Sequence, residues 1–168
     1  IVKFFNDAEK AALTERLGIE EGDLVLFGCD QWDVVCDVLG RLRLEVATMT
    51  SLYEGKDDIL DFFWVIDFPL LAYDKEEGKW NAVHHPFTRP HPEDVALLDD
   101  EANFGKIRGA AYDVVLNGNE LGGGSLRIHE ADLQAKMFRV LGVTDEEQVS
   151  MFGHILGAFQ YGAPPHGG

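Results

Sequence analysis

The chain has 168 residues, a hydrophobic content of 46% and a formal net charge of −16 at pH 7. This length and composition suit one folded domain, or one domain with part of another, and exclude a disordered chain. The negative charge excludes a surface that serves mainly to bind the phosphate backbone of a nucleic acid. The first residue is Ile1 rather than Met, and we expect the chain to be part of a longer protein.

Two cysteines and the hydropathy pattern bear on location. Cys29 and Cys36 lack a CxxC spacing, which favours buried, reduced thiols in a cytoplasmic protein over a disulfide. No apolar run is long enough to cross a membrane, so a membrane partner is not expected.

Residues 1–52 form the first compositional unit. Asp7 is placed to cap a helix that runs through Leu17, and Leu24–Phe27 has the composition of a short strand. A helical period begins at Gln31 and ends at Gly40. The alternation predicts a small α+β module, followed by a boundary in the polar segment 53–61.

Residues 53–168 form the second unit, for which we predict an antiparallel sheet flanked by helices. Phe62–Phe68 is an apolar run that predicts a buried strand, with Asp67 as its single charge, which must be paired or near an opening. Asp74–Lys79 predicts a solvated hairpin loop before a return strand, Trp80–His85. Later helices are predicted around Leu133–Leu141 and after Thr144, which opens a capping box with Glu147.

The segment Ala111–His129, AYDVVLNGNELGGGSLRIH, is the most informative part of the chain. Asn117-Gly118 predicts a two-residue hairpin turn, across which Asp113 and Glu120 emerge on the same face. Two carboxylates on one face suit a Mg²⁺ that also binds phosphate oxygens. The alternative is a hairpin whose acidic side chains only face solvent.

Arg127 lies seven residues after Glu120, so a regular strand would put it on the opposite face. A bulge within Gly122–Gly124 would return it to the face of the two acids, and it would then clamp a carboxylate with two hydrogen bonds. The glycines would also let a ligand approach the main chain. The alternative is a flexible bend followed by a surface arginine. The three glycines do not match the usual phosphate-binding loops.

His84 and His85 are adjacent on the predicted return strand, so they are expected to point to opposite faces. A zinc site is not expected, because the two rings diverge and no cysteine lies near. One ring is a candidate for hydrogen bonding to a ligand, while the other is structural.

Three segments, FFWVIDFPLL (62–71), AVHHPFTRP (82–90) and AYDVVLNGNELGGGSLRIH (111–129), together resemble bacterial-type aspartyl-tRNA synthetases of class II. FQYGAPPHGG at the end of the chain resembles the approach to the third signature motif of that family. Residues 1–52 resemble the later half of the domain inserted into the bacterial enzymes. The resemblance therefore implies a fragment: part of the inserted domain in 1–52 and part of the catalytic domain in 53–168.

The resemblance implies roles for individual residues. His84 and Arg127 would bind the substrate aspartate, Glu120 would bind ATP, and Asp113 and Glu120 would hold Mg²⁺. Supporting positions are His85, Gly122, Gly123, Gly124 and Ser125. No residue is implied as a nucleophile or an acid–base catalyst. The implied reaction joins L-aspartate to ATP, forming aspartyl-adenylate, and then transfers aspartate to the 3′ end of tRNA.

The resemblance also implies what is missing. The first and second motifs, the phosphate-binding arginine of the third motif and the anticodon-binding domain lie outside this chain, so we expect the chain alone to be inactive. The full enzyme would be a cytoplasmic homodimer that binds tRNA mainly through those outside regions. The alternatives are a non-catalytic binding or scaffold module and a ligase that also charges asparagine tRNA. Asn119 and Arg89 depart from the usual family residues.

Overall fold

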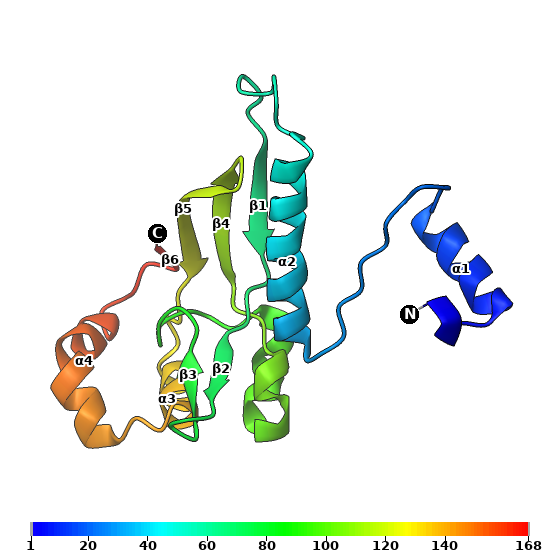
Figure 1. Cartoon of the computed structure of the whole chain (residues 1–168). Helices are drawn as coiled ribbons and strands as arrows, with labels where there is room; N and C mark the ends of the chain where they lie inside the picture. The colour runs from blue at the N-terminus through cyan, green and yellow to red at the C-terminus, as the bar shows by residue number, and fades with distance from the viewer. Residues whose placement is uncertain (1, 168) are drawn as a thin grey trace. The chain divides into compact units, whose positions relative to one another are not determined.

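The computed structural model describes residues 2–167 and contains helices and antiparallel sheets, so the predicted α+β class is confirmed (Figure 1). The chain divides into two compact units, Ile1–Asp58 and Ile59–Gly168. Each unit is described by itself below. Their assignment to an inserted and a catalytic domain stays a prediction.

The first unit contains a short 3-10 helix, η1 (Val2–Phe4), and two α-helices, α1 (Asp7–Leu17) and α2 (Trp32–Met49). α1 has the predicted span, but Asn6 rather than Asp7 caps it. The Asn6 side chain accepts a hydrogen bond from the Glu9 N–H (2.9 Å), and the Glu9 carboxylate accepts one from the Asn6 N–H (2.9 Å). These two bonds satisfy backbone donors that a helix leaves free in its first turn.

Besides the cap at Asp7, three further predictions for the first unit are wrong. Leu24–Phe27 is irregular, because a strand needs a neighbouring strand for its backbone hydrogen bonds and residues 2–58 contain none. α2 continues nine residues beyond Gly40, to Met49, since one glycine costs a helix only about 1 kcal/mol. Cys29 and Cys36 are free, as expected, but both are exposed rather than buried.

The second unit is built on two antiparallel sheets (Figure 1). The larger sheet has the order β1-β4-β5-β6, and the smaller one pairs β2 with β3. The strands are β1 (Phe62–Ile66), β2 (Leu71–Asp74), β3 (Lys79–Ala82), β4 (Ala111–Leu116), β5 (Asn119–Leu126) and β6 (His166–Gly167). The hairpin loop predicted between Asp74 and Lys79 is present, and Lys75 within it is exposed.

β1 is an exposed strand, not the buried one that its composition predicts. Four of its five residues are exposed. Within the described residues, β1 is an edge strand of the larger sheet and pairs with β4. The run ends at Ile66 because Asp67 adopts a left-handed conformation, with φ 59°. Asp67 has the charged partner that the sequence required, since its Oδ1 lies 3.9 Å from Nη1 of Arg108.

The core of the second unit lies between the small sheet and the helices that follow. The 3-10 helices η2 (Pro92–Asp99) and η3 (Glu101–Lys106) and the α-helix α3 (Ala131–Val140) contribute to it. Its buried apolar residues are Leu70, Leu71, Leu98, Phe104, Ile107, Ile128 and Met137. Burial of such side chains is the main stabilising contribution, worth roughly 1.5–3 kcal/mol for each large one.

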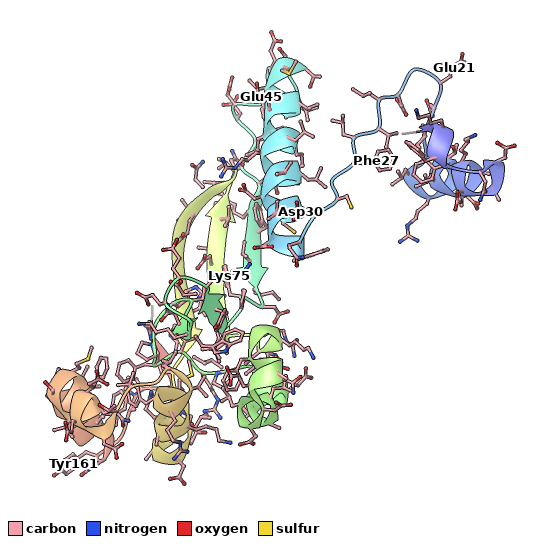
Figure 2. The ribbon with its side chains drawn as sticks, turned by 60° about the horizontal axis from the view of Figure 1, so that its bottom comes forward. Glu21, Phe27, Asp30, Glu45, Lys75 and Tyr161 are labelled. Atoms are coloured by element: carbon pink, nitrogen blue, oxygen red, sulfur yellow. The ribbon has the colours of Figure 1, made fainter. Side chains whose placement is uncertain are left out.

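The last helix, α4 (Asp145–Phe159), begins at the predicted capping box. The Thr144 hydroxyl accepts a hydrogen bond from the Glu147 N–H (3.3 Å), and the Glu147 carboxylate accepts one from the Thr144 N–H (2.8 Å). Aromatic contacts of Phe87 and Phe138 with Phe152 join α4 to the turn after β3 and to α3. Beyond α4, Tyr161 points away from the unit (Figure 2). Within residues 2–167, no helix combines the length and hydrophobicity needed to cross a membrane.

Candidate functional site

The β4–β5 hairpin turns at Asn117-Gly118, as predicted. Both turn residues have positive φ, 48° and 81°, which asparagine and glycine tolerate better than other residues. Asn117 also joins the turn to the segment before β1, because its side chain accepts from the Asp61 N–H (2.8 Å) and donates to the Ile59 carbonyl (2.8 Å). The hairpin therefore has a defined register from its tip.

A bulge in this hairpin brings Asp113, Glu120 and Arg127 to one face of the sheet. Val115 pairs with Glu120, but Val114 pairs with Gly122, so Leu121 is the extra residue. Beyond the bulge, Asp113 pairs with Gly123, and the alternation of β5 carries Arg127 to the side of Asp113. The predicted bulge exists, one residue before the glycines where the sequence placed it.

Two of the three glycines make room for side chains of the hairpin itself. A Cβ on Gly123 would overlap the Asp113 carboxylate, and a Cβ on Gly124 would lie 2.7 Å from the Tyr112 hydroxyl. Gly122 has open space around it. The sequence analysis assigned these glycines to close approach of a ligand, whereas the structure shows that Asp113 and Tyr112 lie across the backbone at two of them. Ser125, the next supporting position, is buried.

His84 and His85 do not lie on a strand, because β3 ends at Ala82. Strand geometry therefore does not require the two side chains to face opposite ways. They nevertheless have different surroundings. The exposed ring of His84 packs edge-on against Phe68, with ring centroids 5.0 Å apart, and the half-buried His85 lies beside Arg127.

Arg127 is half-buried and has neighbours on several sides. Its Nη1 donates toward Nδ1 of His85 (3.4 Å), and its N–H donates to the carbonyl of Pro165 (2.9 Å). A Cβ on Gly167 would come within 2.6 Å of the guanidinium, so β6 passes directly beside it. His85, Arg127, His166 and Gly167 share the lining of a hollow with apolar side chains of α4. The arginine is therefore held by surrounding backbone rather than free in solvent.

Gln134 on α3 is a supporting residue that the sequence analysis missed. Its residue is 3% exposed, and its Nε2 donates to the carbonyl of Pro86 (2.9 Å). The turn that contains Pro86 closes with a hydrogen bond from the Thr88 N–H to the His85 carbonyl (3.1 Å). Gln134 thus ties α3 to the turn that carries His85. A glutamine among the apolar residues of a helix was the available signal.

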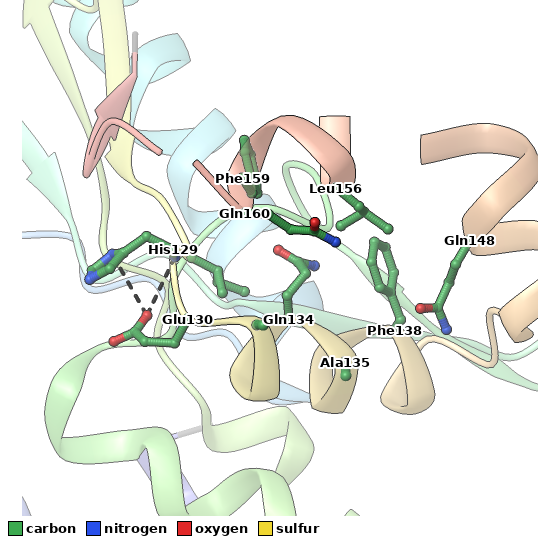
Figure 3. Close-up of a pocket in the computed structure, with 11 residues that line it drawn as sticks. His129, Glu130, Gln134, Ala135, Phe138, Gln148, Leu156, Phe159 and Gln160 are labelled. Carbon is green, nitrogen blue, oxygen red and sulfur yellow. Dashed lines mark hydrogen bonds and ion pairs between the residues drawn. The ribbon is translucent and has the colours of Figure 1, made fainter. Parts of the chain in front are cut away.

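A separate cavity of about 250 Å³ lies between α3 and α4 (Figure 3). Gln134, Phe138, Leu156, Phe159 and Gln160 line it, and His129 and Glu130 stand at its rim. Its lining contains none of the residues to which the resemblance gave a role in binding substrate, ATP or metal. The candidate site is therefore the sheet face with Asp113, Glu120 and Arg127.

Asp113 and Glu120 fit a divalent cation of the magnesium type. They lie on one face of the β4–β5 ribbon, since Glu120 pairs with Val115 and Asp113 is two residues from Val115 along β4. Both offer hard oxygen ligands, and Gly123 leaves the space that the Asp113 carboxylate occupies. Among residues 2–167, no group of three or more acidic, histidine or cysteine side chains forms a complete protein site. The pair therefore suits an ion that takes further oxygens from a phosphate and water.

The ion pair of Asp94 with Arg108 is structural. Asp94 accepts hydrogen bonds from Nε (2.8 Å), Nη2 (3.0 Å) and the backbone N–H (2.9 Å) of Arg108. These bonds lower the pKa of Asp94 to about 2, in spite of the opposing effect of burial. The pair joins η2 to the segment that leads into β4.

Comparison with known proteins gives this face a context. The family model described as tRNA synthetases class II (D, K and N) matches residues 14–168. The chain belongs to this family. The class II synthetase chain is 55% identical over 168 residues to an "Aspartate--tRNA(Asp/Asn) ligase" of Heliobacterium modesticaldum and 53% identical over 168 residues to an "Aspartate--tRNA ligase" of Geobacillus kaustophilus. Both matches cover 100% of this chain.

The class II synthetase chain spans 27% of the length of the first relative and 28% of the second. Among solved structures, it matches an aspartyl-tRNA synthetase from Entamoeba histolytica with a TM-score of 0.42 and 19% sequence identity, over 95% of this chain and 24% of that one.

Arg89 has a charged partner on the segment before α3. Its Nη1 donates to the Glu130 carboxylate (2.7 Å), and this bond is the main cause of a lowered pKa of Glu130. This ion pair therefore lies beside the cavity between α3 and α4, whose lining includes Glu130.

Proposed function

We propose that this chain supplies the aspartate- and metal-binding wall of a longer aspartate–tRNA ligase that uses ATP and Mg²⁺. The observation that carries the proposal is the bulge at Leu121, which puts Asp113, Glu120 and Arg127 on one face. Identities of 53–55% to proteins with ligase names, over the whole chain, support the same function.

In the proposed reaction, each residue has a physical role. Arg127 presents two parallel N–H donors to the side-chain carboxylate of aspartate, a geometry that lysine cannot match. His84 makes a further contact with the amino acid. Asp113 and Glu120 hold Mg²⁺, which would neutralise charge on the phosphates of ATP when bound. Positioning and charge stabilisation, rather than a protein nucleophile, would account for the rate.

The test is aspartate-dependent exchange of pyrophosphate into ATP by the longer protein that contains this chain. Arg127→Lys should raise KM for aspartate by roughly 100-fold, because a charged, two-bond contact is replaced by a single point charge. KM for ATP should change less than twofold. Unchanged KM for aspartate in this variant would contradict the proposed clamp.

The proposal also covers the chain by itself and its alternatives. The isolated 168-residue chain should show no exchange activity, because the phosphate-binding arginines of the family lie outside it. A non-catalytic scaffold role is disfavoured, since all three residues of the proposed site are retained on one face. The cytoplasm and a homodimer are proposed for the longer enzyme. Charging purified aspartate and asparagine tRNAs would separate the two kinds of ligase named among the relatives.

A further inference from the structure

We propose that His85 is a positioning residue for Arg127: its Nδ1 accepts a hydrogen bond that sets the orientation of the guanidinium toward the substrate carboxylate. This inference rests on the proposed function, in which Arg127 binds aspartate. It assigns His85 an action through the arginine, not a contact with the substrate.

The hydrogen-bond pattern determines which tautomer of His85 is present. Nδ1 lies 3.1 Å from the backbone nitrogen of Phe87 and 3.4 Å from Nη1 of Arg127. A backbone N–H and a guanidinium can only donate, so Nδ1 must be the unprotonated acceptor and the ring proton lies on Nε2. A proton on Nδ1 would face both donors at once.

The backbone around His85 holds the ring in place. Two hydrogen bonds close the turn that begins at His85. The Phe87 N–H donates to Nδ1 of His85, and the Thr88 N–H donates to the His85 carbonyl (3.1 Å). Gln134 fastens the same turn to α3 through the carbonyl of Pro86. An acceptor that is fixed in this way can orient a long side chain, which would otherwise sample many rotamers.

The charges around His85 favour its neutral form. Burial is the first cause of a lowered pKa of His85, and the positive charges of Arg127 and His84 act in the same direction. His166, from β6, also lines the hollow, but its ring stacks on Tyr112 rather than on His85. A neutral ring is the form that the acceptor role requires.

The experiment compares His85→Asn, whose Oδ1 can stand where Nδ1 stands, with His85→Leu, which has no acceptor. Both are made in the longer protein, with Arg127→Lys beside them and Gly157→Ala as a control, since a Cβ there meets nothing within 4 Å. The readouts are KM for aspartate, KM for ATP and kcat in pyrophosphate exchange, with melting curves to establish folding.

We expect His85→Leu to raise KM for aspartate about tenfold, as suits one lost hydrogen bond to a charged group, while KM for ATP stays within twofold. His85→Asn should recover most of this loss. In the unsubstituted protein KM for aspartate should also rise as pH falls below the pKa of His85, and the rise should be smaller in His85→Asn.

Three results would contradict the positioning role of His85. If Arg127→Lys raises KM for aspartate but His85→Leu leaves it within twofold, His85 does not position the arginine. Equal damage by His85→Asn and His85→Leu would show that ring packing, not the acceptor, matters. If Arg127→Lys itself has no effect, the proposed clamp fails and the inference fails with it. If His85→Leu does not fold, His85→Gln takes its place in the comparison with His85→Asn, because the amide oxygen of glutamine lies one carbon farther from the backbone.

Discussion

The carboxylate of Asp113 lies over the backbone of Gly123, in the space that a Cβ on that residue would occupy. The two residues are direct partners across the β4–β5 ladder. A glycine is therefore needed opposite Asp113 for steric reasons, whatever ligand the carboxylate binds.

Gly123→Ala should displace the Asp113 side chain, because the new methyl group would also meet the Tyr112 carbonyl at 3.0 Å. We expect a loss of about 1–3 kcal/mol in the free energy of unfolding, as in other overpacked sites. In the longer protein, the Mg²⁺ concentration for half-maximal exchange should rise. Gly157→Ala serves as the control, and equal urea midpoints for the two variants would contradict the steric argument.

Asn117 can be tested at the hairpin tip. Asn117→Gly keeps the positive φ but removes the hydrogen bonds to Ile59 and Asp61, whereas Asn117→Ala removes the bonds and adds backbone strain. We expect losses of about 0.5–1.5 kcal/mol for glycine and about 1–2 kcal/mol more for alanine, measured by urea unfolding. If Asn117→Ala is as stable to urea as Asn117→Gly, the predicted backbone strain is absent.

Asp94→Asn should weaken the link between η2 and Arg108 by about 1–3 kcal/mol at pH 7, since it loses hydrogen bonds to a charged group. The pKa of Asp94 in the fold, about 2, lies below its ordinary value of 3.8. The pair's contribution is therefore complete above pH 4 and lost as pH falls toward 2.

Urea unfolding of the unsubstituted protein and of Asp94→Asn at a series of pH values checks this prediction. The stability difference should shrink between pH 4 and pH 2. Asp99→Asn is a matched control, because Asp99 pairs with Lys136 but is 67% exposed, and such pairs contribute about 0–1 kcal/mol. A difference that persists undiminished at pH 2 would contradict the assignment to the charged pair.

Gln134→Leu keeps the approximate size of a buried side chain and removes its bond to the Pro86 carbonyl. Loss of this bond to a partly buried carbonyl costs about 0.5–1.5 kcal/mol. Removal of the buried Gln134 Oε1, which has no partner among the described residues, offsets part of this cost, so the variant should melt at a slightly lower temperature. Because the same turn carries His85, KM for aspartate in the longer protein should rise more than KM for ATP. Parallel changes in both constants would mean a general loss of structure instead.

Local sequence signals predicted the elements that local interactions determine. The Asn117-Gly118 turn, the Thr144 capping box and the span of α1 were predicted because each rests on bonds between residues a few positions apart. Leu24–Phe27 and β1 were predicted less well. Strand formation and burial depend on partners distant in sequence, which composition cannot name.

The candidate site was predicted in part. Parity along the hairpin placed Asp113 and Glu120 correctly on one face, and the need for a bulge followed from Arg127. The bulge position at Leu121, the neighbour pair His85–Arg127 and the support from Gln134 were not predictable. They depend on contacts between β5, the turn after β3 and α3, which are far apart along the chain.

The extra residue at Leu121 makes the site sensitive to strand length counted in single residues. Deleting Leu121 would restore a regular ladder and turn either Glu120 or Arg127 to the far side of the sheet, although every functional residue would still be encoded. Insertions and deletions between these two residues should therefore be tolerated only in pairs. A ligase with a one-residue gap there should lose aspartate activation without losing its fold.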